Sequence, residues 1–78
     1  MLRRTEKLVI TFHTTTAAMA MESSCKAAQM DGRLIPVPGS ISADCGLAWC
    51  AKPESEEMLL QHMQAQGIEY QGIHRCLI

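Results

Sequence analysis

The chain has 78 residues, of which 47% are hydrophobic and 19% charged, and its formal net charge is −1. This length allows one small domain of globular rather than disordered composition, and the near-neutral charge with only 4% aromatic residues argues against a nucleic-acid-binding protein. No apolar run approaches the ~20 residues of a membrane helix and no signal-peptide core is present, so we expect a cytoplasmic protein without membrane contact.

The first part of the chain predicts a strand, a helix and an edge strand. Residues 1–6 are charged and expected to be frayed, whereas the β-branched and aromatic residues 7–12 predict a strand. Thr14 or Thr15 is a candidate N-cap for a helix that extends to about Met30, with Gly32 in a left-handed conformation after it. The apolar residues of this helix that fall at helical spacing are Ala18, Met21, Cys25 and Ala28.

The second part predicts two further strands and a second helix. Residues 33–38 form a strand in which two prolines remove backbone donors, so this strand should lie at a sheet edge. Residues 39–44 have loop composition, and residues 45–51 predict a strand. A second helix is expected from Pro53 to Gly67, and residues 70–77 contain the last strand. The expected buried residues of the second helix are Leu59, Leu60 and Met63.

The order strand, helix, strand, strand, helix, strand predicts a single α+β domain over residues 1–78. It is the order of the ferredoxin-like βαββαβ fold, a four-stranded antiparallel sheet with two helices on one face. The second strand of that fold lies at an edge of the sheet. The prolines require the same placement, so two separate features of the sequence favour this fold.

The predicted topology brings Cys45 close to the start of the first helix. The loop 39–44 and the turn after the first strand should lie on one rim of the sheet, because the third strand neighbours the first. A helix start has unpaired amides and a positive dipole end, which favour an anion such as a thiolate. Asp44 opposes this effect by its like charge, and Gly46 allows close approach of another group. The residues expected to stabilise the anion are His13, Thr14, Thr15 and Thr16. We therefore expect the Cys45 sulfur to be solvent-accessible and to face the amide end of the first helix.

The four cysteines of the chain include no CxxC pair, and without a secretory signal we expect reduced thiols. Cys25 lies on the helical apolar stripe and is expected in the core; Cys50 is expected to be inert, and the role of Cys76 stays open. Cys45 and Cys50 would be about 16 Å apart on opposite faces of one strand, whereas a disulfide needs Cα atoms within about 7 Å. Cys45 thus lacks a resolving partner, which favours a carrier thiol over a dithiol oxidoreductase.

Metal binding is an alternative hypothesis, since three histidines and the cysteines have the right atom types. The close ligand spacing of structural zinc is approached only at His74–Cys76. Ferredoxin-like metal chaperones carry a CxxC pair in the loop after the first strand, where this chain has threonines. The same helix start could instead hold a phosphate or another anion, although a simple threonine cap is the preferred interpretation.

Three parts of the sequence resemble a known family. They are Val9–Phe12 running into Thr15–Met19, then Gly32–Pro38, and then Ile41–Ala48. Together they resemble the selenium/sulfur carrier-like proteins, a family of small bacterial domains. The resemblance covers nearly the whole chain and is most specific over residues 33–48. Family members often have a charged pair after the second proline, where this chain has Gly39 and Ser40.

The resemblance implies that Cys45, preceded by Ser42 and Asp44 in its loop and followed by Gly46, carries sulfur or selenium as a persulfide or selenosulfide. The protein would then be a carrier rather than an enzyme. It would receive its cargo from a donor such as a cysteine desulfurase and hand it to an acceptor protein. Sulfur or selenium would be covalent cargo, with no further cofactor and no metal. A second hypothesis, from another class, is a non-catalytic interaction module that forms a homodimer through a sheet edge or an open face.

Overall fold

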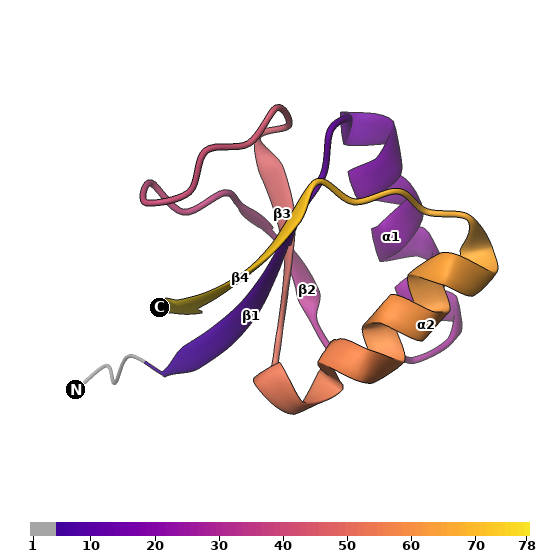
Figure 1. The fold of residues 1–78 in the computed structure, drawn as a ribbon. Helices are drawn as coiled ribbons and strands as arrows, with labels where there is room; N and C mark the ends of the chain where they lie inside the picture. The colour runs from indigo at the N-terminus through magenta and orange to yellow at the C-terminus, as the bar shows by residue number, and fades with distance from the viewer. Residues whose placement is uncertain (1–4) are drawn as a thin grey trace.

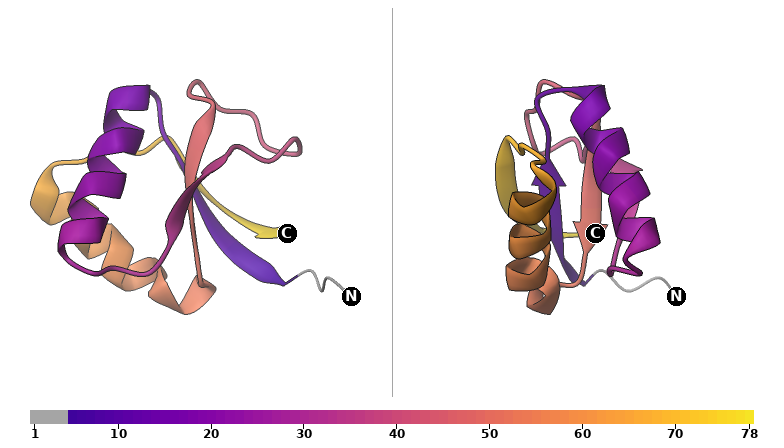
Figure 2. Two further views of the ribbon diagram at one scale, coloured as in Figure 1. Left: turned by 180° about the vertical axis from the view of Figure 1, so that it is seen from behind. Right: turned by 90° about the vertical axis from the view of Figure 1, so that its right-hand side faces the viewer.

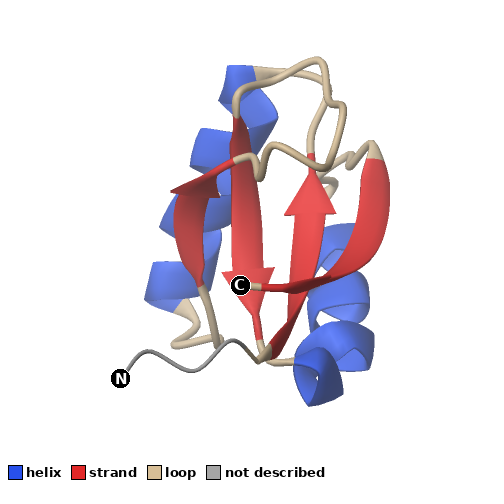
Figure 3. Ribbon diagram, turned by 90° about the vertical axis from the view of Figure 1, so that its left-hand side faces the viewer, coloured by secondary structure: helices blue, strands red, loops and turns tan. Residues whose placement is uncertain are grey.

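The computed structural model describes residues 5–78 and shows a four-stranded antiparallel sheet with two helices on one face (Figure 1). The elements are β1 (Glu6–Thr11), α1 (Thr15–Ala27), β2 (Arg33–Pro36), β3 (Leu47–Ala51), the 3-10 turn η1 (Pro53–Ser55), α2 (Glu56–Gln66) and β4 (Gly72–Leu77). The strand order is β2-β3-β1-β4, as Figure 3 shows from the side of the sheet that the helices leave open. The predicted ferredoxin-like fold is therefore confirmed. Of the segment expected to be frayed, residues 1–4 lie outside the described part, and Glu6 already belongs to β1.

The strand β2 lies at an edge of the sheet, as its prolines predict. It is shorter than expected and ends at Pro36, after which Val37 N–H donates to the Gly46 carbonyl at 3.0 Å. The connection from β2 to β3 then extends on the side of the sheet opposite the helices (Figure 1). Both helices cover the other side, and Figure 2 shows them from two further directions.

The core lies between the sheet and the two helices. Burial confirms most of the apolar stripe predicted for each helix, but Ala28 is exposed and Leu60 is only half-buried. Alternate residues of β1 and β3 complete the core from the sheet, because successive strand side chains point to opposite faces. The large buried side chains of this cluster are Leu8, Ile10, Phe12, Met21, Trp49, Leu59 and Met63.

The helix ends follow local rules, with one correction. Thr14 is the N-cap of α1, where its hydroxyl accepts a hydrogen bond from Ala17 N–H at 3.1 Å. The prediction that α1 extends to about Met30 is wrong, because the helix ends at Ala27 and Met30 N–H donates back to the Cys25 carbonyl at 2.8 Å. The left-handed residue in this Schellman-type end is Gln29, with φ 55°.

Gly32 has the predicted positive φ, but it does not form the end of α1. Its φ is 121°, and a Cβ at this position would lie 2.3 Å from Trp49 Nε1 and 2.7 Å from the Cys50 carbonyl. Glycine is therefore required where the chain enters β2 against the Trp49 ring. The second helix does end as predicted, at Gly67 with φ 69°.

Three further boundaries differ from the prediction. Strand β3 begins at Leu47 rather than Cys45, because the chain bends at Cys45 and Cys45 N–H donates to the Phe12 carbonyl beyond the end of β1 at 3.2 Å. Pro53 opens the short turn η1, and α2 begins only at Glu56. Strand β4 begins at Gly72 rather than at residue 70.

Candidate functional site

The topology places Cys45 at the start of α1, as predicted. Its sulfur lies 3.6 Å from Thr15 Oγ1, the hydroxyl of the first residue of that helix. Leu47 N–H also donates to the Cys45 sulfur, at a distance of 3.4 Å. The thiol is thus held between the first turn of α1 and the first residue of β3, and both contacts come from groups that can donate to an anionic sulfur.

The expectation that the Cys45 sulfur is solvent-accessible is wrong. Cys45 is 4% exposed and belongs to the core cluster between sheet and helices. The bend before β3 turns its side chain inward, whereas its neighbours Asp44 and Gly46 are both exposed. A Cβ built on Gly46 would meet no atom within 4 Å, so open space adjoins the backbone next to the thiol. The sulfur therefore lies inside the rim of the molecule rather than on its surface.

An exposed polar network lies over this rim. His13 Nδ1 lies 3.0 Å from Asp44 Oδ2, and both side chains are more than half exposed. Asp44 N–H donates to Gln71 Oε1 at 3.0 Å, and Gln71 N–H donates to the Thr11 carbonyl. Asp44 is therefore paired with His13 at the loop that carries Cys45. Gln71 is not among the residues predicted for the site, because it lies 27 residues from Asp44 and carries no local signal.

The four residues expected to stabilise an anion have different roles. The Thr15 hydroxyl contacts the sulfur, the Thr14 hydroxyl caps the helix, and His13 pairs with Asp44. Thr16 is exposed in the first turn of α1, and Ser42 is exposed in the loop. One side chain of the four, Thr15, is thus hydrogen-bonded to the candidate thiol.

All four cysteines are free thiols, and the three besides Cys45 are buried or half-buried. Cys25 is buried in the core as predicted, and burial raises the pKa of its thiol from 9.0 to about 11, with a smaller opposing effect of the Ser24 hydroxyl. Burial also raises the pKa of the Cys50 thiol, against the opposing charges of Arg33 and Lys7. Cys76 is half-buried in β4.

Metal binding and membrane spanning can both be checked for the described part of the chain. Within residues 5–78, no group of three or more His, Cys, Asp or Glu side chains is arranged to hold a metal ion. Neither helix of that part has the length and apolar character needed to cross a bilayer.

The fold and the rim define a small α+β domain with one thiol hydrogen-bonded at the start of its first helix. Residues 7–75 match the model of the family described as "Putative Se/S carrier protein-like". The match covers most of the 78 residues, and the chain belongs to this family. No curated protein and no solved structure gives a significant match.

Proposed function

We propose that this protein carries sulfur or selenium on Cys45. Its family supports the carrier class, and the resemblance of residues 41–48 to family members singles out this cysteine. The observation that carries the proposal is the position of the Cys45 sulfur against Thr15 Oγ1 and Leu47 N–H, at 3.6 and 3.4 Å. Hydrogen-bond donors at this place stabilise a negatively charged sulfur, which is the form that attacks and is attacked in exchange.

The transfer is an exchange between sulfur atoms. The Cys45 thiolate attacks the outer sulfur of a persulfide on a donor such as a cysteine desulfurase. A new S–S bond forms at Cys45, the S–S bond of the donor breaks, and the donor cysteine leaves as a thiolate. An acceptor thiolate then attacks the outer sulfur on Cys45 and returns Cys45 to its thiolate. Charge and atoms balance in each step, and no oxidant or reductant is consumed.

The burial of Cys45 adds a requirement to this proposal. A partner sulfur can approach only if the groups packed around the Cys45 sulfur move, because Cys45 is 4% exposed. The loop backbone around Cys45 is attached to the rest of the fold by Asp44 N–H to Gln71 Oε1 and by Cys45 N–H to the Phe12 carbonyl. Breaking two such bonds costs about 1–3 kcal/mol, which a docking partner can supply.

The test is mass spectrometry after incubation with a cysteine desulfurase and cysteine. We expect a gain of one sulfur atom that is lost in Cys45→Ser and retained in the matched control Cys76→Ser. No lysine or arginine lies between Cys45 and Cys50, so the two cysteines share one tryptic peptide. Fragment ions that break the chain between Gly46 and Trp49 assign the added sulfur to one of the two.

Uptake by Cys45→Ser equal to that of the parent would overturn the proposal. An unmodified parent protein whose melting temperature rises with concentration would instead support the non-catalytic homodimerisation module. The same experiment with a selenium donor in place of the sulfur donor distinguishes the two cargoes.

A further inference from the structure

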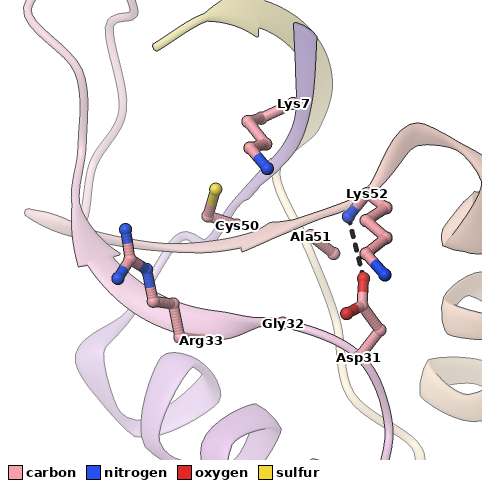
Figure 4. A pocket seen from close by; sticks show the side chains of 7 residues that line it. All are labelled: Lys7, Asp31, Gly32, Arg33, Cys50, Ala51 and Lys52. Atoms are coloured by element: carbon pink, nitrogen blue, oxygen red, sulfur yellow. Dashed lines mark hydrogen bonds between the residues drawn. The ribbon is translucent and has the colours of Figure 1, made fainter. Parts of the chain in front are cut away.

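A second site lies at the end of β3 away from Cys45. It is a pocket of about 260 Å³ that opens on the surface near the start of η1 (Figure 4). Its lining residues come from three separate stretches of the chain: Lys7, Asp31, Gly32, Arg33, Cys50, Ala51 and Lys52. Neither Cys45 nor any residue that contacts its sulfur belongs to this lining.

The lining is strongly positive on a chain whose formal net charge is −1. It contains three cations and one carboxylate, Asp31. One oxygen of that carboxylate, Oδ2, already accepts from Lys52 N–H at 2.8 Å and from the Ser55 hydroxyl at 3.2 Å. Asp31 is therefore engaged in fixing the backbone at the start of η1, and the lining keeps an excess of two positive charges.

Among residues 5–78, the three cations of the pocket form no ion pair with a carboxylate. The ion pairs found among residues 5–78 are His13 with Asp44 and Arg75 with Glu6 and Glu56. Lys7, Arg33 and Lys52 form none of them. Cations that gather in one pocket and outnumber its single carboxylate favour the binding of an anionic ligand.

The pocket also has a thiol in its wall. Cys50 is opposite Arg33 in the β2–β3 register and opposite Val9 in the β1–β3 register, on the same sheet face as Lys7. In Figure 4 the Cys50 sulfur lies between the side chains of Lys7 and Arg33. Both cations act on the Cys50 charge, which agrees with their convergence on this sulfur.

We propose that this pocket binds a small divalent oxyanion, such as sulfate or thiosulfate, between Lys7 and Arg33 and against the sulfur of Cys50, with Lys52 adding positive charge at the other end of the lining. The Arg33 guanidinium presents paired N–H donors that match two oxygens of such an anion, and the two lysines add point charges. Two negative charges match the excess of the lining. The proposal rests on the pocket alone and stands or falls independently of the carrier role of Cys45.

The test is a titration of the ¹⁵N-labelled full chain with sodium sulfate, at an ionic strength held constant with sodium chloride. We expect saturable shifts of the amide signals of residues 7, 31–33 and 50–52. The variants Lys7→Gln and Arg33→Gln should each weaken sulfate binding about fivefold or more, because each loses a charge-assisted contact. Lys26→Gln, at the last turn of α1, is the matched control and should bind as the parent does.

Shifts that chloride alone reproduces, or that concentrate at residues 13–16, would overturn the proposal. So would undiminished binding in both pocket variants, whose amide spectra also report whether they are folded. A parallel titration with thiosulfate tests the contact with the thiol, because its terminal sulfur can lie against Cys50. Tighter binding of thiosulfate than of sulfate supports that orientation, and equal binding assigns the affinity to the oxyanion group that they share.

Discussion

The sulfur of Cys45 lies 3.6 Å from the hydroxyl of Thr15, although 30 residues separate the two in the chain. The contact joins the first turn of α1 to the bend before β3. Replacing Thr15 with Val removes the hydroxyl and keeps the shape. If this hydroxyl donates to the Cys45 thiolate, the share of persulfide formed on Cys45 in a fixed short time with glutathione persulfide should fall about fivefold, since one hydrogen bond contributes ~1 kcal/mol to the anion that attacks. Quantitative mass spectrometry measures this share.

The matched control for this experiment is Thr16→Val, one residue further along the same exposed helix start. It should leave the persulfide share unchanged. A Thr15→Val protein that loads as fully as the parent would show that the hydroxyl does not stabilise the charged sulfur.

Thr14 has a structural role that is separable from that of Thr15. Its hydroxyl accepts from Ala17 N–H at 3.1 Å and caps α1. Thr14→Ala should lower the free energy of unfolding by about 1 kcal/mol, as loss of an N-cap usually does. Urea denaturation of the variant beside Thr16→Ala, which removes no cap, provides the measurement. Equal losses in the two variants would contradict the capping role.

Two glycines should differ in how much substitution by alanine destabilises the fold. At Gly32 the new Cβ would lie 2.3 Å from Trp49 Nε1, in a backbone conformation that L-residues rarely adopt. Gly32→Ala should therefore destabilise the fold by about 2 kcal/mol or more. At Gly46 nothing lies within 4 Å of the added atom, so Gly46→Ala should stay within about 0.5 kcal/mol of the parent. Denaturant midpoints that are equal for the two variants would refute this account of Gly32.

The buried thiol of Cys25 predicts how stability changes in alkali. Burial raises its pKa from 9.0 to about 11 in the folded chain. Between these two pH values the Cys25 thiol loses its proton in the unfolded chain but keeps it in the folded chain. Deprotonation therefore stabilises the unfolded state relative to the folded state. The contribution of Cys25 to the free energy of unfolding is complete below pH 9 and is lost progressively as the pH rises to about 11.

This dependence is measured as the free energy of unfolding in urea at a series of pH values under reducing conditions. Cys25→Ala should flatten the slope above pH 9, even though the variant starts from a lower stability. The raised pKa of Cys50 acts in the same direction and leaves part of the slope in place. An unchanged slope in Cys25→Ala would show that this thiol does not titrate differently in the folded chain.

Local sequence signals determined most of the architecture. The β-branched run of β1, the threonine cap of α1 and the left-handed Gly67 act within a few residues of their own positions. The prolines of β2 predicted an edge strand, because a missing N–H is harmless only there. The order of these elements was then enough to predict the sheet and to bring Cys45 to the start of α1.

The tertiary structure alone decided whether the Cys45 thiol faces water. The sequence pattern placed Cys45 at the beginning of a strand beside a polar loop, which favours exposure. Its N–H bonds to Phe12 beyond the end of β1 instead, and the resulting bend turns the sulfur into the core. The end of α1 was likewise not predictable from local sequence, since Gln29 rather than Gly32 takes the left-handed conformation there. Close packing against Trp49 explains why residue 32 is a glycine.

The cationic pocket depended on tertiary structure altogether. Lys7, Arg33 and Lys52 lie far apart in the sequence, and nothing in their spacing predicts that they line one pocket. They line one pocket because β2 and β1 both lie beside β3, and because Asp31 holds the backbone at Lys52 where η1 begins. Strand propensity and capping depend on neighbours in the chain, so the sequence by itself carries them. The burial of a thiol and the gathering of charges depend on residues that lie far apart in the chain, and only the packed fold brings these together.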